Sequence, residues 1–91
     1  MSTSYHISSV NEIRYLNDKK EPYAHLEYDQ LSSTIKITDK RIDFTLTFIS
    51  RDYPDKMTDF WNKLIKDSKK KKLSSLETVI NKMKVKFKIK D

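Results

Sequence analysis

Three stretches of the chain alternate between apolar and polar residues, which is the pattern of a β-strand with one buried face. They cover residues 23–28 (YAHLEY), 34–38 (TIKIT) and 41–50 (RIDFTLTFIS). The polar segment 39–41 (DKR) between the last two is typical of a hairpin turn. The pattern therefore predicts an antiparallel meander. The residues expected to face its core are Ala24, Leu26, Tyr28, Ile35, Ile37, Ile42, Phe44, Leu46 and Phe48.

The stretch 53–67 (YPDKMTDFWNKLIKD) has the apolar stripe of a helix that packs on one side. The stripe consists of Met57, Phe60, Trp61, Leu64 and Ile65. Proline fixes φ in the first turn of a helix, so Pro54 indicates where this helix starts. We expect Trp61 to be a core anchor, because a large aromatic side chain in such a stripe buries the most apolar surface.

A second helix is predicted within 73–83 (LSSLETVINKM), where Ser74 and Glu77 have the spacing of a capping box. Beyond it, Val85, Phe87 and Ile89 recur at every second position, which favours a strand over 84–90. The first twenty residues are ambiguous, because SSVNEIRYL offers both a capping box and an alternating pattern.

These elements predict one small α+β domain over residues 1–91. Its fold class is an antiparallel meander of three to four strands packed against one or two helices, with or without a C-terminal strand. Residues 68–72 (SKKKK) would form a basic connector between the two C-terminal helices.

The composition excludes several classes of protein. With no cysteine among 91 residues there is no disulfide, thiolate nucleophile or Cys-containing zinc site, and with no glycine there is no Gly-rich phosphate loop. No apolar run approaches the roughly 20 residues of a membrane span, and the polar start lacks the apolar stretch of a signal peptide. We therefore expect a cytoplasmic or nuclear protein without a membrane partner.

The sequence offers little for catalysis. His6 and His25 are the only histidines, and neither has metal-ligand spacing to the other or to a carboxylate. No serine has the surroundings of a nucleophile. We expect a protein that is not an enzyme, with no cofactor, no metal site and no small-molecule substrate.

The positive charge is concentrated in the second half of the chain. Residues 1–50 contain six Lys and Arg against seven Asp and Glu, whereas residues 51–91 contain thirteen against six. Such asymmetry indicates an acidic partner. If residues 84–90 form a strand, their four alternate lysines would project from one face at intervals of about 6.6 Å. The candidate phosphate-contacting residues are Lys63, Lys66, Lys69, Lys70, Lys71, Lys72, Lys84, Lys86, Lys88 and Lys90. The alternative is that these lysines only keep an edge strand from pairing, or reflect genome composition.

Residues 7–66 resemble the smaller subunit of the signal recognition particle Alu-domain heterodimer. The similarity is carried by Tyr15, Leu16, Asp18, Leu26, Tyr28, Thr38, Asp39, Phe60 and Leu64. It implies an αβββα fold with a first helix over 4–16, a related partner subunit, and a sheet that binds the RNA backbone. That family's sheet is basic, whereas Glu27 and Asp29 occupy strand positions here.

Two functions therefore follow. The first is a basic RNA-binding, or more broadly nucleic-acid-binding, ribonucleoprotein subunit that neutralises phosphates with little base specificity. The second is a small adaptor or inhibitor, of phage or mobile-element type, that acts by protein–protein interaction through a strand edge or a helix face. Either function is compatible with a homo- or hetero-oligomer, because a domain of this size buries only part of its apolar surface.

Overall fold

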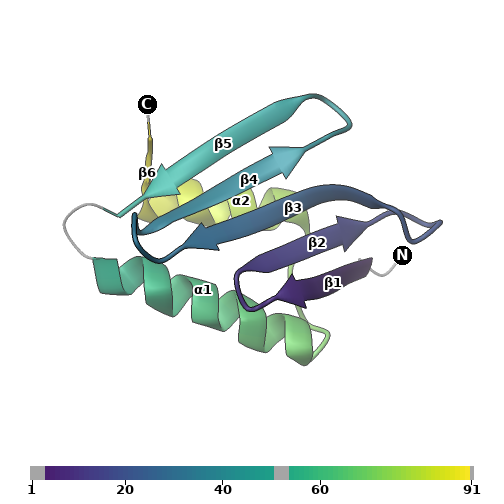
Figure 1. Cartoon of the computed structure of the whole chain (residues 1–91), viewed down its shortest axis with the longest axis horizontal. Helices are drawn as coiled ribbons and strands as arrows, with labels where there is room; N and C mark the ends of the chain where they lie inside the picture. The colour runs from purple at the N-terminus through teal and green to yellow at the C-terminus, as the bar shows by residue number, and fades with distance from the viewer. Residues whose placement is uncertain (1–3, 51–53, 91) are drawn as a thin grey trace.

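The computed structural model describes residues 4–50 and 54–90, which form an α+β fold with an open antiparallel sheet and two helices (Figure 1). Six strands follow one another across the sheet in chain order. The strands are β1 (Ser4–Ser9), β2 (Glu12–Leu16), β3 (Pro22–Asp29), β4 (Thr34–Asp39), β5 (Phe44–Ile49) and β6 (Lys88–Ile89). The helices α1 (Pro54–Lys69) and α2 (Leu76–Lys86) lie between β5 and β6 in the chain.

Both helices pack on the same face of the sheet. Apolar side chains of α1 and α2 join those of β2 to β5 in one hydrophobic core, and the two aromatic rings of Tyr28 and Trp61 stack with centroids 5.5 Å apart. The opposite face is covered by neither helix, and we call it the open face. Its strand residues include His6, Glu12, Arg14, His25, Glu27, Lys36, Thr38, Thr45 and Thr47.

The predicted meander is confirmed, and it occupies the middle of a larger sheet. The inward residues of β3 and β4 are buried as expected, and β5 contributes Phe48 with no exposed surface. Ile42 is an exception, because it lies in the turn between β4 and β5 and is 69% exposed. The turn covers residues 40–43, one residue more than predicted, and Asp43 at its end has a left-handed conformation with φ of 49°.

The ambiguous N-terminal stretch forms a hairpin, so the helix over 4–16 that the family resemblance implies is wrong for this chain. β1 pairs with β2 and β2 pairs with β3, which raises the strand number above the predicted three to four. Of the two patterns, the structure follows the alternating one: Ile13 and Tyr15 are both fully buried, and Arg14 between them is exposed. A helix would have placed Ile13 and Tyr15 on different sides.

The first predicted helix is confirmed as α1. Met57, Phe60, Trp61 and Leu64 are buried, and Ile65 packs at the edge of the core. Pro54 is the first helical residue, as expected from its fixed φ. Tyr53, the first residue of the predicted helix, lies outside the described residues.

The second helix is confirmed, but it starts and ends differently from the prediction. Its N-cap is Ser75, whose Oγ accepts a hydrogen bond from the Thr78 backbone N–H, and not Ser74. It continues to Lys86, so the strand predicted over 84–90 is wrong except at Lys88–Ile89.

The helix extends because the buried positions keep helical spacing to its end. Leu76, Val79, Met83 and Phe87 are all buried, whereas Val85 is 87% exposed. The Phe87 backbone N–H donates to the Met83 carbonyl at 2.8 Å, and the Phe87 ring meets Phe60 edge-on. Burial of Phe87 against α1 therefore outweighed the local preference of Val85 and Phe87 for a strand.

Helix α1 ends in a Schellman motif built without glycine. The Lys72 N–H donates to the Asp67 carbonyl at 2.8 Å and the Lys71 N–H to the Ser68 carbonyl at 3.1 Å. Lys71 has φ of 59°, the left-handed conformation in which a Cβ atom costs energy. As a result the predicted connector 68–72 is partly helical, and Lys70 to Ser75 link the helices.

We expect Lys71→Gly to raise the free energy of unfolding by roughly 0.5–1 kcal/mol, because glycine removes the Cβ strain and loses only part of that gain to unfolded-chain entropy. Urea unfolding followed by circular dichroism measures the change. The matched control is Lys70→Gly, which removes the same charge at a residue with ordinary φ and should lower stability. If both substitutions change the free energy of unfolding by the same amount, the backbone at Lys71 is not strained.

Candidate functional site

A groove runs between α1 and α2 on the outer side of the helical layer. It consists of two adjoining depressions of about 520 and 210 Å³ that share Phe60, Lys63 and Lys86. We call it the interhelical groove. Apolar side chains form its floor, including Phe60, Leu64, Val79 and Phe87, and four lysines and two aspartates line it, namely Lys56, Lys63, Lys82, Lys86, Asp59 and Asp67.

Helical periodicity brings the cations of the groove together. Lys82 and Lys86 are four residues apart and lie on the side of α2 that faces α1. Lys63 reaches the groove from α1, and the Lys86 Nζ atom lies 5.4 Å from the centroid of the Phe60 ring. The groove therefore presents cations from both helices beside an apolar floor, so it can attract an anion.

Two more predicted lysines extend the positive surface along α1. Lys66 is exposed on α1 about one turn after Lys63, and Lys70 is exposed in the residue that follows the helix. Lys69, Lys71 and Lys72 are also exposed and cluster where α1 ends, which complements the negative end of its dipole. The structure thus brings Lys63 and Lys86 together in the groove, and Lys66 follows Lys63 on α1.

The remaining predicted lysines are dispersed, which corrects the expectation that residues 84 to 90 form one row. Lys84 lies on the far side of α2, in a depression with Arg41 and Glu77. Lys88 pairs with Ile49 on β5, and the Lys90 backbone N–H donates to the Thr47 carbonyl at 2.7 Å. The row is broken because α2 continues to Lys86 and the chain then crosses to the edge of the sheet.

Sequence reasoning missed two lysines that line the groove. Lys56 lies between Asp55 and Asp59 in the sequence, and Lys82 belongs to neither the connector 68–72 nor the predicted strand 84–90. Their spacing to Lys63 and Lys86, seven and four residues, is the helical signal that would have found them.

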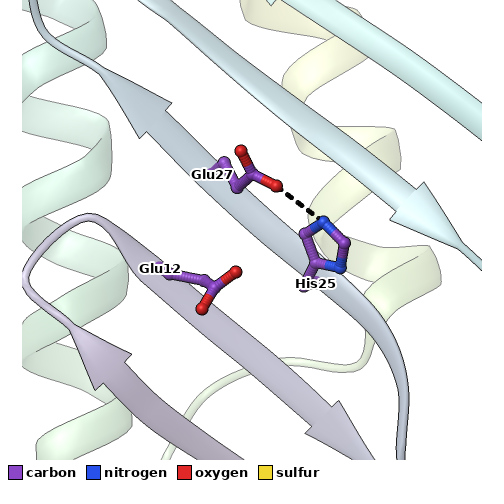
Figure 2. Close-up of side chains that lie close together, drawn as sticks. All are labelled: Glu12, His25 and Glu27. Carbon is purple, nitrogen blue, oxygen red and sulfur yellow. Dashed lines mark ion pairs between the residues drawn. The ribbon is translucent and has the colours of Figure 1, made fainter.

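A second polar cluster lies on the open face, formed by Glu12 of β2 with His25 and Glu27 of β3 (Figure 2). Glu12 is directly opposite Glu27 in the sheet register. The His25 Nε2 atom is 2.7 Å from the Glu27 Oε1 atom, and one ligand atom from each of the three side chains lies within 4.8 Å of the others. Spacing along the chain did not reveal this cluster, because Glu12 is brought next to His25 and Glu27 by the pairing of β2 with β3.

Neighbouring polar groups hold Glu12 in its ionised form. The Ser8 hydroxyl donates a hydrogen bond to Glu12, and the Arg14 Nε atom donates to the same carboxylate at 3.1 Å. Both interactions lower the pKa of the Glu12 carboxyl, the Ser8 hydrogen bond more strongly, and burial opposes them. The open face therefore carries an ionised carboxylate on β2, in contact with the Arg14 guanidinium.

Within residues 4–50 and 54–90, neither helix is long and apolar enough to cross a lipid bilayer. Comparisons with protein-family models, with curated protein sequences and with solved structures found no match to this chain.

Proposed function

We propose that the protein is a non-enzymatic RNA-binding subunit that contacts the phosphate backbone through its helical layer. The observation that carries the proposal is the interhelical groove, in which lysines from both helices line two adjoining depressions. Lysine ammonium groups neutralise phosphates without reading bases, so the expected binding is salt-dependent and has little sequence specificity.

The helical layer is a better candidate for this contact than the sheet. On the open face, Glu12 and Glu27 lie between the basic side chains of Arg14 and Lys36, so the charge is mixed and a phosphate backbone would meet carboxylates. The groove and the outward side of α1 instead carry Lys63, Lys66 and Lys86 with a smaller number of acidic groups. The proposed mode therefore differs from the sheet-mediated contact that the family resemblance implies.

An acidic protein segment is the second candidate ligand. Val85 is 87% exposed beside the groove, and the floor contains the Phe60 and Phe87 rings. An amphipathic helix with acidic flanks could place apolar side chains on this floor and carboxylates near the lysines. This is the adaptor function, and the RNA measurement below separates it from the first.

We expect the double substitution Lys63→Gln with Lys86→Gln to weaken binding to single-stranded RNA by roughly tenfold and to reduce the log–log salt slope by about 1 to 2. Two phosphate contacts would be lost, and the fold should be unchanged because both side chains are exposed. Fluorescence anisotropy of labelled single-stranded RNA, a structured RNA and duplex DNA across a salt series gives both quantities.

The matched control is Lys88→Gln with Lys90→Gln, which removes the same charge from the edge strand and the segment after it. This control should change the affinity by less than about threefold, since only long-range attraction is lost. If both double variants lose the same affinity for RNA, the binding depends only on net charge. That result would contradict the proposal that the groove is the RNA-binding site. Binding no tighter than about 100 μM in the unsubstituted protein at physiological salt would favour the protein-binding alternative.

A further inference from the structure

The cluster of Glu12, His25 and Glu27 combines the donor types that divalent transition ions prefer. Two carboxylate oxygens and an imidazole nitrogen converge from two paired strands, and Figure 2 shows all three side chains on the same side of the sheet. The backbone positions are fixed by the ladder, because Glu12 pairs with Glu27 and His25 lies two residues before Glu27 on the same face. A mixed nitrogen and oxygen set of this kind suits Zn²⁺ and related ions better than Mg²⁺.

Small side-chain rotations are enough for the three side chains to surround an ion, because their ligand atoms are already close to one another. Ligand atoms at roughly 2.0–2.1 Å from a tetrahedral zinc ion are about 3.4 Å apart. The three ligand atoms already lie within 4.8 Å of one another, and the His25 Nε2 and Glu27 Oε1 atoms are 2.7 Å apart. The imidazole and the carboxylate would separate by less than about 1 Å, which side-chain torsions alone allow.

The electrostatics also favour a cation between the two carboxylates. Like charges directly opposite on neighbouring strands destabilise a sheet, and Glu12 and Glu27 are such a pair. The Arg14 guanidinium offsets part of this repulsion by its contact with Glu12. A shallow depression of about 190 Å³ lies over the cluster and is also lined by Arg14, Pro22 and Lys40, so water can complete the coordination of an ion.

We propose that Glu12, His25 and Glu27 form a binding site for one divalent transition ion of the zinc class, with water filling the remaining positions. The site is on the open face, on the other side of the sheet from the interhelical groove, so it is independent of the proposed RNA contact. In binding, the ion takes the place of the Arg14 guanidinium at Glu12 and opens the contact between His25 and Glu27.

Isothermal titration of the untagged protein with Zn²⁺, together with thermal unfolding, tests the site. We expect one ion per chain and a rise in Tm of several degrees at saturating Zn²⁺, because an ion that binds only the folded state stabilises it. His25→Ala and Glu27→Gln should each weaken binding by more than about tenfold, since each removes a ligand. Mg²⁺ at the same concentration should leave the Tm unchanged.

Two further substitutions separate this site from adventitious binding. Arg14→Ala should tighten Zn²⁺ binding about two- to fivefold, because it frees Glu12 from an exposed ion pair. His6→Ala is the matched control, since it removes the other histidine of the open face and should leave the affinity unchanged. The Lys63→Gln, Lys86→Gln protein should also bind Zn²⁺ normally, so the failure of one proposal does not affect the other.

The proposal is overturned if Zn²⁺ binds no more tightly than about 1 mM, or if His6→Ala weakens binding as much as His25→Ala. It is also overturned if Arg14→Ala weakens binding, because the ion would then depend on the guanidinium or on the ion-pair network and not on a freed carboxylate.

Discussion

Replacing Trp61 with alanine should lower the free energy of unfolding by roughly 3–5 kcal/mol. Trp61 is only 2% exposed, its ring stacks on Tyr28, and its indole N–H donates a hydrogen bond to the Val10 carbonyl at 2.8 Å. The substitution leaves a large cavity between α1 and the sheet and removes the hydrogen bond to the turn from β1 to β2. Because a small domain has only about 5–15 kcal/mol of stability in total, much of the protein should unfold.

Urea unfolding followed by far-ultraviolet circular dichroism measures this loss, since Trp61 is the only tryptophan and its fluorescence disappears with it. Trp61→Phe should cost less, because an aromatic ring still fills most of the cavity and stacks on Tyr28. The neighbouring Asn62 is exposed, and Asn62→Ala should change stability by no more than about 0.5 kcal/mol. A small effect of Trp61→Ala would mean that α1 is not anchored to the sheet by this side chain.

Asp39→Ala should destabilise the protein by roughly 2–3 kcal/mol. Asp39 is buried at the end of β4 and accepts hydrogen bonds from the Arg41 backbone N–H at 2.9 Å and from the Arg41 guanidinium at 2.8 and 3.1 Å. The guanidinium in turn lies 4.1 Å from the centroid of the Tyr23 ring, so the same network ties the turn before β5 to β3. Tyr23 itself packs against the core beside this network.

The effect of Asp39→Ala should depend on pH. The hydrogen bonds from Arg41 lower the pKa of the Asp39 carboxyl below its ordinary value, so the folded state favours the ionised form. A carboxyl with a lowered folded-state pKa contributes stability above the unfolded pKa of about 3.9, and this contribution is lost as the pH falls through the folded-state pKa. The difference in free energy of unfolding between the unsubstituted protein and Asp39→Ala should therefore be largest near pH 6 and shrink as the solution is acidified below about pH 4.

Denaturant unfolding between pH 2.5 and 7 gives this dependence. Lys40→Ala is the matched control, because Lys40 is the exposed neighbour of the pair and should change stability by no more than about 0.5 kcal/mol at every pH. A stability difference that stays constant on acidification would show that Asp39 acts through packing alone and not through its charge.

The proposed RNA contact and the proposed metal site use different layers of the molecule. The first depends on the distance between two helices, and the second on the register of two strands. Substitutions at Lys63 or at His25 should therefore change one activity and leave the other unaffected, which is the additivity expected of separated sites.

The local pattern of residues was sufficient to predict the central strands and both helices. In β3 and β4 the alternation of apolar and polar side chains agrees with what pairing and burial require, and in α1 the stripe around Trp61 has one interpretation only. Where local signals conflicted, at Ser9 to Tyr15 and at Lys84 to Ile89, the pattern was compatible with two elements. The choice there depended on burial of Tyr15 and Phe87 against distant parts of the chain.

The candidate sites depended still more on tertiary structure. Charge counting located the positive half of the chain. It could not show that Lys63 and Lys86 share a groove, because helix packing decides which side chains face one another. Nor could it show that the remaining lysines lie elsewhere, namely Lys84, Lys88 and Lys90. The Glu12, His25 and Glu27 cluster could not be read from spacing along the chain. It exists because pairing of β2 with β3 brings together side chains thirteen and fifteen residues apart, and pairing register is a property of the folded sheet.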